Sequence, residues 1–244
     1  MSIRIPALAT NIERRLLINY RLDPGVAQSL LPDTLRPQLV RGSAVAGICL
    51  LRLGALRPTW FAPGIGWGAE NAAHRIAVEW GDGTGTHQGV YIPERHSASW
   101  LPVAAGGRVF PGVQKHAHFE GSETPNRIHV AMTSKDTTVR ADVAVSSTFT
   151  SGLFSTLDDA SAFFRAGSIG WSPARDGHAL QCIRLDTDQW WLDAGQAISV
   201  ESSFFDALPA GAARLDSVLV MRNVPIIRSA PRAIRSRVPM ATAF

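Results

Sequence analysis

Apolar and polar residues alternate along several stretches of the chain, which is the pattern of a strand with one buried face. The clearest stretches cover residues 15–20, 75–80 and 139–146. Further strands are expected over three shorter stretches, Ala179–Leu185, Ile198–Phe204 and Val218–Val224. The pattern predicts a mostly β protein.

Helix signals are few. Asp23 followed by Pro24 is typical of a helix N-terminus, and Pro32 should end that helix. A second helix is expected to begin at Ser155 or Thr156 and to end near Gly167.

Length and composition point to one globular domain over residues 1–244, with a basic tail from about residue 225. The longest apolar run, Ala44–Leu51, is much shorter than a membrane helix requires, and the N-terminus has no signal-peptide pattern. We therefore expect no membrane partner and a cytoplasmic location. The two cysteines, Cys49 and Cys182, are expected to be small core residues.

The formal charge is +4, but the positive residues are spread along the chain apart from the tail. Such a distribution does not favour a nucleic-acid partner. The glycine-rich segment Gly81–Gly85 lies between two strand patterns and has no phosphate-loop spacing, so it predicts a hairpin turn. No cofactor is expected.

The use of lysine is unusual in this chain. Of 24 basic residues only Lys115 and Lys135 are lysines. In a strand over residues 115–119, Lys115 shares a face with Ala117 and Phe119. A lysine on an apolar face loses hydration, which lowers the pKa of its amine and makes the amine a better nucleophile. The alternative is a lysine whose amine reaches solvent.

Histidines offer a rival chemistry. His116 and His118 share the opposite strand face, and a hairpin turning near Thr124 would place His129 beside His118. Three histidines can bind zinc or iron, although exposed histidines on the outer face of a hairpin are the ordinary interpretation. We therefore predict no metal site. A serine hydrolase is disfavoured because the chain has no G-x-S-x-G motif.

Two segments of the chain resemble the acetoacetate decarboxylase superfamily, nearest its YqjF-like bacterial branch. Tyr20-Arg21-Leu22-Asp23 with Leu31-Pro32 and Leu35 is similar to the family's opening Y-R-T-D and V-P-x-x-L. Gly107-Arg108 through Lys115-His116 is similar to G-R-x-x-x-G-x-P-K-K. Between them, Ile76-Ala77-Val78 and Gly89-Val90-Tyr91 match two family strands. The resemblance is usable over about residues 11–150.

This resemblance implies a cone-shaped antiparallel β-barrel of the acetoacetate decarboxylase type, with a few short helices and usually a homo-oligomeric assembly. In the decarboxylase the first lysine of the pair forms a Schiff base with a β-keto acid, and the second cation lowers its pKa. Lys115 matches the Schiff-base lysine. Arg21 matches the arginine that meets the substrate carboxylate.

The chain also departs from the family pattern. His116 replaces the second lysine, and Gln114 replaces the preceding proline. One family carboxylate falls near Gly47 and the other at Asn71, with Glu70 one residue away. These changes argue against decarboxylation of acetoacetate itself.

The leading hypothesis is a Schiff-base lyase, decarboxylase-like or aldol/dehydratase-like. Lys115 attacks a carbonyl compound, Arg21 holds a carboxylate, and His116 or Glu70 moves protons, with Asn71 as a further substrate-binding residue. The alternative is a non-catalytic β-barrel that binds a small hydrophobic ligand. The expected partner in both cases is a small molecule, and the chain is expected to form at least a homodimer.

Overall fold

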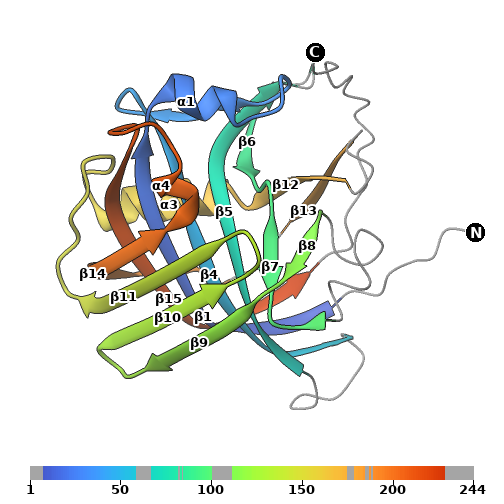
Figure 1. Ribbon diagram of the computed structural model, residues 1–244, viewed down its shortest axis with the longest axis vertical. Coiled ribbons are helices and arrows are strands. Elements are labelled where there is room, and N and C mark those ends of the chain that lie inside the picture. Colours follow the sequence, from blue (N-terminus) through green and yellow to red (C-terminus); the bar gives the residue numbers. More distant parts are fainter. Residues whose placement is uncertain are drawn as a thin grey trace, which may run out of the picture.

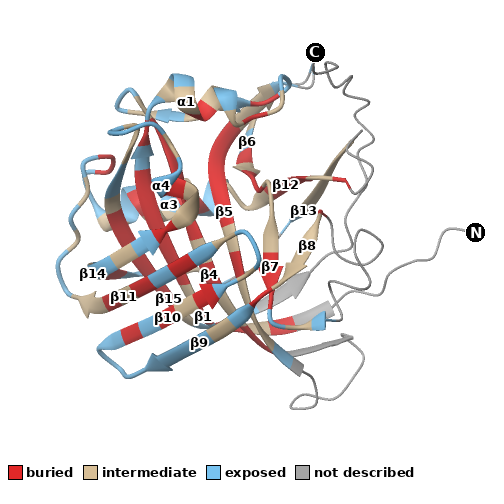
Figure 2. Cartoon of the chain, in the orientation of Figure 1, coloured by how far each residue is buried: buried red, intermediate tan, exposed pale blue. Residues whose placement is uncertain are grey.

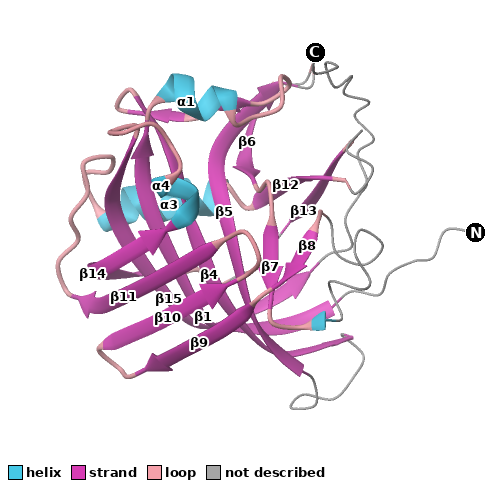
Figure 3. Ribbon diagram, in the orientation of Figure 1, coloured by secondary structure: helices cyan, strands magenta, loops and turns pink. Residues whose placement is uncertain are grey.

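The computed structural model describes most of the chain, namely residues 8–58, 67–81, 83, 85–100, 112–174, 179–184, 187 and 189–228. Most of these residues are in strands (Figure 3). The strands are β1 (Leu8–Leu22), β2 (Arg36–Pro37), β3 (Leu39–Val40), β4 (Ser43–Pro58), β5 (Trp67–Gly81), β6 (Thr86–Tyr91), β7 (Arg95–Ser97), β8 (Gln114–His116), β9 (His118–Glu123), β10 (Arg127–Thr133), β11 (Thr138–Ser146), β12 (Ile169–Pro173), β13 (Leu180–Arg184), β14 (Asp193–Ser202) and β15 (Ala213–Arg228). The helices are α1 (Pro24–Ser29), α3 (Leu157–Ala166) and α4 (Ser203–Asp206).

The strands of the described residues form one large mixed sheet, with its main path in the order β13-β12-β6-β5-β4-β1-β15-β14-β11-β10-β9. Antiparallel pairing dominates, as expected, but β12 pairs with β6 and β7 with β8 in parallel. The sheet curls, so that β9, β10, β11 and β14 cross in front of β1, β4 and β5 (Figure 1). It is barrel-like without closing, because β13 and β9 remain its two ends.

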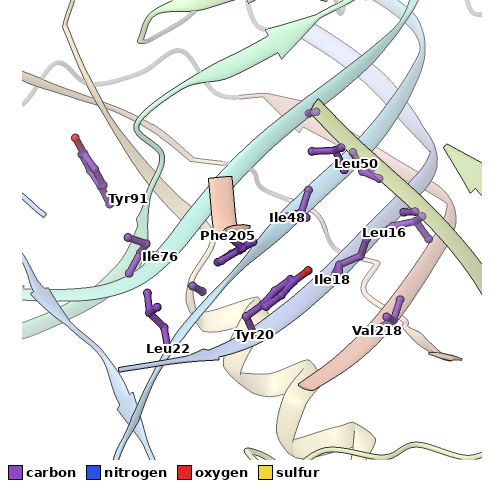
Figure 4. Close-up of a cluster of buried hydrophobic side chains, with 14 of the residues drawn as sticks. Leu16, Ile18, Tyr20, Leu22, Ile48, Leu50, Ile76, Tyr91, Phe205 and Val218 are labelled. Carbon is purple, nitrogen blue, oxygen red and sulfur yellow. The ribbon is translucent and has the colours of Figure 1, made fainter. Parts of the chain in front are cut away.

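Alternation along the strands sends side chains to two separate apolar clusters. Leu16, Ile18 and Tyr20 of β1 belong to a cluster on the inner, concave face of the curl (Figure 4). Leu17 belongs to a second cluster on the outer face, where α3 packs through Phe164. The central strands are therefore buried on both sides, whereas β9 is largely exposed (Figure 2).

Both predicted helix starts are confirmed. The Asp23 carboxylate accepts a hydrogen bond from the backbone N–H of Val26, with Pro24 at the first helical position of α1. Thr156 and Asp159 form a reciprocal capping box at the start of α3.

Some expectations need correction or fall outside the described residues. The strand expected to reach Phe204 ends at Ser202, and α4 begins at the next residue. Residues 101–111, which contain the Gly107-Arg108 motif, and the tail beyond residue 228 lie outside the described part. Cys49 and Cys182 are both half-buried, and neither is in a disulfide.

Candidate functional site

Lys115 lies on the inner face of the sheet. It pairs in register with His96 of β7, which in turn pairs with Ala72 of β5, a member of the inner cluster. Ala117, two residues after Lys115, is also in this cluster, and Phe119 packs against it. The face predicted from the alternation is therefore correct.

The surroundings of the Lys115 amine differ from the expected apolar environment. Its Nζ is 2.8 Å from Glu94 Oε1 and 3.4 Å from Asp136 Oδ2, and 32% of the side chain is exposed. The hydrogen bond with Glu94 is the main reason that the pKa of Lys115 is raised above its usual value. The expected lowering of this pKa by loss of hydration is wrong, because carboxylates outweigh burial at this position.

A buried histidine lies next to this lysine. His96 is only 1% exposed, and neither ring nitrogen makes a hydrogen bond with another described residue. Burial lowers the pKa of His96, and the charge of Lys115 lowers it further, whereas Glu94 and Asp136 act in the opposite direction. At neutral pH this imidazole is therefore uncharged.

The inner face carries polar groups in successive layers along β5. His74, Ala72 and Glu70 follow one another at two-residue spacing, so neighbouring layers are separated by about 7 Å. The Ala72 layer contains His96 and Lys115 through the pairing of β5, β7 and β8. The layer on one side therefore contains His74, and the layer on the other side contains Glu70.

The Glu70 layer is a row of charges across four strands. Register places Glu70 opposite Arg52, Arg52 opposite Arg14, and Arg14 opposite Arg222. Glu70 accepts hydrogen bonds from Arg14 at 2.6 Å and from Arg52 at 2.7 Å. Glu123 of β9 reaches the same cluster from across the curl, 3.1 Å from Arg222 Nε and 3.6 Å from both Arg14 and Arg52.

The cluster carries three guanidinium groups and two carboxylates. Arg14 is completely buried, and its Nε and Nη1 make no hydrogen bond with another described residue. Burial lowers the pKa of Arg14 despite the charge of Glu70. An excess positive charge on the inner face is suited to binding an anion.

The two residues considered for the family carboxylate lie on opposite faces of β5. Glu70 is on the inner face with Arg14 and Arg52, whereas the Asn71 amide donates to the carbonyl of Ala69 on the other face. Of the two, Glu70 therefore shares the inner face with Lys115. Gly47 has no room for a side chain, because an added Cβ would lie 2.4 Å from the carbonyl oxygen of Ile18.

Arg21 is not brought together with Lys115. Tyr20 and Leu22 point inward, so Arg21 points outward, where its Nε is 3.3 Å from Asp216 Oδ1. The sheet thus separates Arg21 from the inner face. The expected contact of Arg21 with a substrate carboxylate required it to lie on that face.

The remaining histidine expectations can also be placed. His116 lies on the opposite face from Lys115 and stacks on Trp100 with ring centroids 3.9 Å apart. His129 lies opposite Ser122 and His118 opposite Thr133, so the expected neighbourhood of these two histidines is wrong. The described residues contain no group of three or more His, Cys, Asp or Glu side chains that could hold a metal ion.

Sequence reasoning missed several residues of this site. Glu94 and Asp136 lie in connections beside strands, and His96 is in a strand of three residues, too short to show alternation. Arg14 ends the apolar series Leu16, Ile18 and Tyr20 on the inner face of β1, and a charged residue at that point of the alternation is a signal that the sequence offers.

Comparison with known proteins yields one family and several similar structures. The model of the family DUF2071, described as "Uncharacterized conserved protein (COG2071)", matches residues 10–224. No curated protein matches the chain. In the described part of the chain, no helix has both the length and the hydropathy of a membrane span.

Several solved structures have a similar fold. An acetoacetate decarboxylase-like enzyme from Sphingomonas wittichii RW1 has a TM-score of 0.65 at 15% identity, covering 96% of this chain and 95% of that one. The enduracididine biosynthesis enzyme MppR, complexed with pyruvate, has a TM-score of 0.56 at 15% identity, with coverage of 95% and 91%. Acetoacetate decarboxylase from Legionella pneumophila has a TM-score of 0.57 at 13% identity, with coverage of 95% and 92%. These likenesses confirm the fold that the sequence motifs implied.

Proposed function

This chain belongs to the family DUF2071, and from its acetoacetate decarboxylase-like fold we propose that it is an enzyme that forms a Schiff base between Lys115 and a keto acid. The observation that carries the proposal is the position of the Lys115 amine. It extends from the inner face, within 2.8 Å of Glu94 and in register with the buried His96. MppR, which shares this fold, was solved with pyruvate, a keto acid.

Carbonyl chemistry follows from these groups. The deprotonated amine attacks the carbonyl carbon, and loss of water gives a protonated imine, which withdraws electrons from the neighbouring carbon. Glu94 and Asp136 stabilise this cation as they stabilise the ammonium ion. Such an imine serves decarboxylation, aldol and dehydratase chemistry, and the departures from the family pattern at residues 47, 71 and 116 argue against decarboxylation of acetoacetate itself.

The substrate carboxylate is assigned to the charged cluster rather than to Arg21. Arg14 and Arg52 lie on the inner face, one layer from the layer of Lys115, and their cluster has an excess of positive charge. Nε of Arg14 makes no hydrogen bond with another described residue. A carboxylate accepting from these donors would hold the carbonyl group toward Lys115.

A non-catalytic barrel that binds a small hydrophobic ligand is the second candidate. The raised pKa of Lys115 favours it, because a protonated amine is not a nucleophile. The inner face is also largely apolar around Tyr20, Tyr91 and Phe205. The two candidates differ in whether a covalent adduct forms.

The test is reductive trapping. The protein is incubated with pyruvate or acetone, reduced with borohydride and mapped by peptide mass spectrometry. We expect an adduct at Lys115 that is lost in Lys115→Arg and kept in Lys135→Arg. Lys135 is the only other lysine and is exposed, so it reports non-specific reaction. Equal labelling of both lysines, or no adduct at Lys115, would refute the Schiff-base proposal and favour the binding protein.

A further inference from the structure

We propose that His96 is the catalytic base that removes a proton from the carbon next to the Schiff base at Lys115. This inference rests on the proposed function and assigns its proton-transfer step. It concerns a residue that the sequence motifs did not single out.

The hydrogen bonding of His96 sets it apart from the other buried histidine. His74 is 5% exposed, its Nε2 is 2.9 Å from Ser202 Oγ, and its ring stacks on Phe204. His96 is even more buried, yet both its ring nitrogens make no hydrogen bond with the described residues. Because buried polar groups in proteins are nearly always hydrogen-bonded, two unused nitrogens on one imidazole point to a ligand that is not present.

The charges around His96 suit a base. The titratable groups that act on it are Glu94, Lys115 and Asp136, and His96 itself acts on His74. Burial and Lys115 keep the imidazole uncharged, so a nitrogen lone pair is available to accept a proton. Once the imidazole is protonated, Glu94 and Asp136 stabilise the new positive charge.

The step is balanced without any other reactant. The protonated imine draws electron density from the carbon next to it, and the imidazole nitrogen takes a proton from that carbon. The C–H electron pair becomes the C=C bond of an enamine, and the C=N π pair moves to the nitrogen of Lys115. The imidazolium then returns the proton, or a solvent deuteron, to the same carbon.

Deuterium exchange separates this step from Schiff-base formation. In D₂O, exchange of the methyl protons of pyruvate is followed by NMR, and adduct formation is measured in parallel by borohydride trapping. For His96→Gln we expect an exchange rate at least about 100-fold below that of the unmodified protein. The rate of trapping at Lys115 should stay within about 3-fold of that of the unmodified protein, because His96 acts only after the Schiff base has formed. His74→Gln is the matched buried control and should keep exchange.

The outcomes are distinguishable. If the unmodified protein gives neither adduct nor exchange, the proposed function fails. If it gives an adduct without exchange, or if His96→Gln exchanges at the unmodified rate, only the role of His96 fails. Thermal unfolding monitored by circular dichroism checks that each variant is folded. If His96→Gln is unfolded, His96→Asn is measured in its place with the same criteria.

Discussion

At the residue scale, the ion pair between Lys115 and Glu94 determines how the amine responds to pH. The folded-state pKa of Lys115 is raised, so the amine stays protonated to higher pH than an isolated lysine. We expect the rate of borohydride trapping to increase with pH and to reach its plateau only above about pH 10.5.

Glu94→Gln removes the largest cause of the raised pKa, so its trapping profile should shift to lower pH. Glu79→Gln, a half-buried glutamate on β5, is the control and should leave the profile in place. A profile for Glu94→Gln that coincides with that of the unmodified protein would contradict the assignment of this ion pair.

At the scale of elements, α3 covers the outer face of the sheet and is anchored at its start by the capping box. Thr156 accepts a hydrogen bond from the backbone N–H of Asp159, and the helix buries Phe164 against Arg75 of β5. Thr156→Ala leaves that N–H without its partner. It should lower the free energy of unfolding by about 1 kcal/mol, measured by urea denaturation.

Thr34→Ala is the control for this cap, because Thr34 is exposed in the turn after α1. We expect it to change stability much less than Thr156→Ala. Equal effects of the two substitutions would show that the cap contributes nothing specific.

At the scale of the whole molecule, the curled sheet leaves two ends, and association between copies of the chain stays a prediction. β9 pairs only with β10 among the described residues, so its other edge has free backbone groups. Trp100 and Trp191 are 67% and 48% exposed, which is unusual for large apolar side chains. We expect static light scattering to give at least a dimer. A monomer at micromolar concentration would contradict this.

The charged cluster joins strands that are far apart in the sheet order. Glu123 lies on β9, at one end of the sheet, and forms ion pairs with Arg14 of β1, Arg52 of β4 and Arg222 of β15. These contacts cross the inside of the curl rather than following the strand order. They bring residues distant in sequence to one place on the inner face.

The sequence by itself determined the features that depend on neighbouring residues. Alternation predicted the strands and the inner face of Lys115, and Asp23 and Thr156 predicted the helix starts, because strand faces and caps are set within a few residues. The order of the family motifs was enough to indicate the acetoacetate decarboxylase-like fold.

Only the tertiary structure decided what surrounds each side chain. A strand pattern gives the face of Lys115 but not the two carboxylates that meet its amine from separate connections. Likewise, Glu70 rather than Asn71 lies on the inner face with Lys115, and so does Arg14 rather than Arg21. Pairing register and the bulges in β1 fix which of these side chains face inward. The pKa of Lys115 was mispredicted for the same reason. Electrostatic partners come from the curl of the whole sheet, which local patterns do not encode.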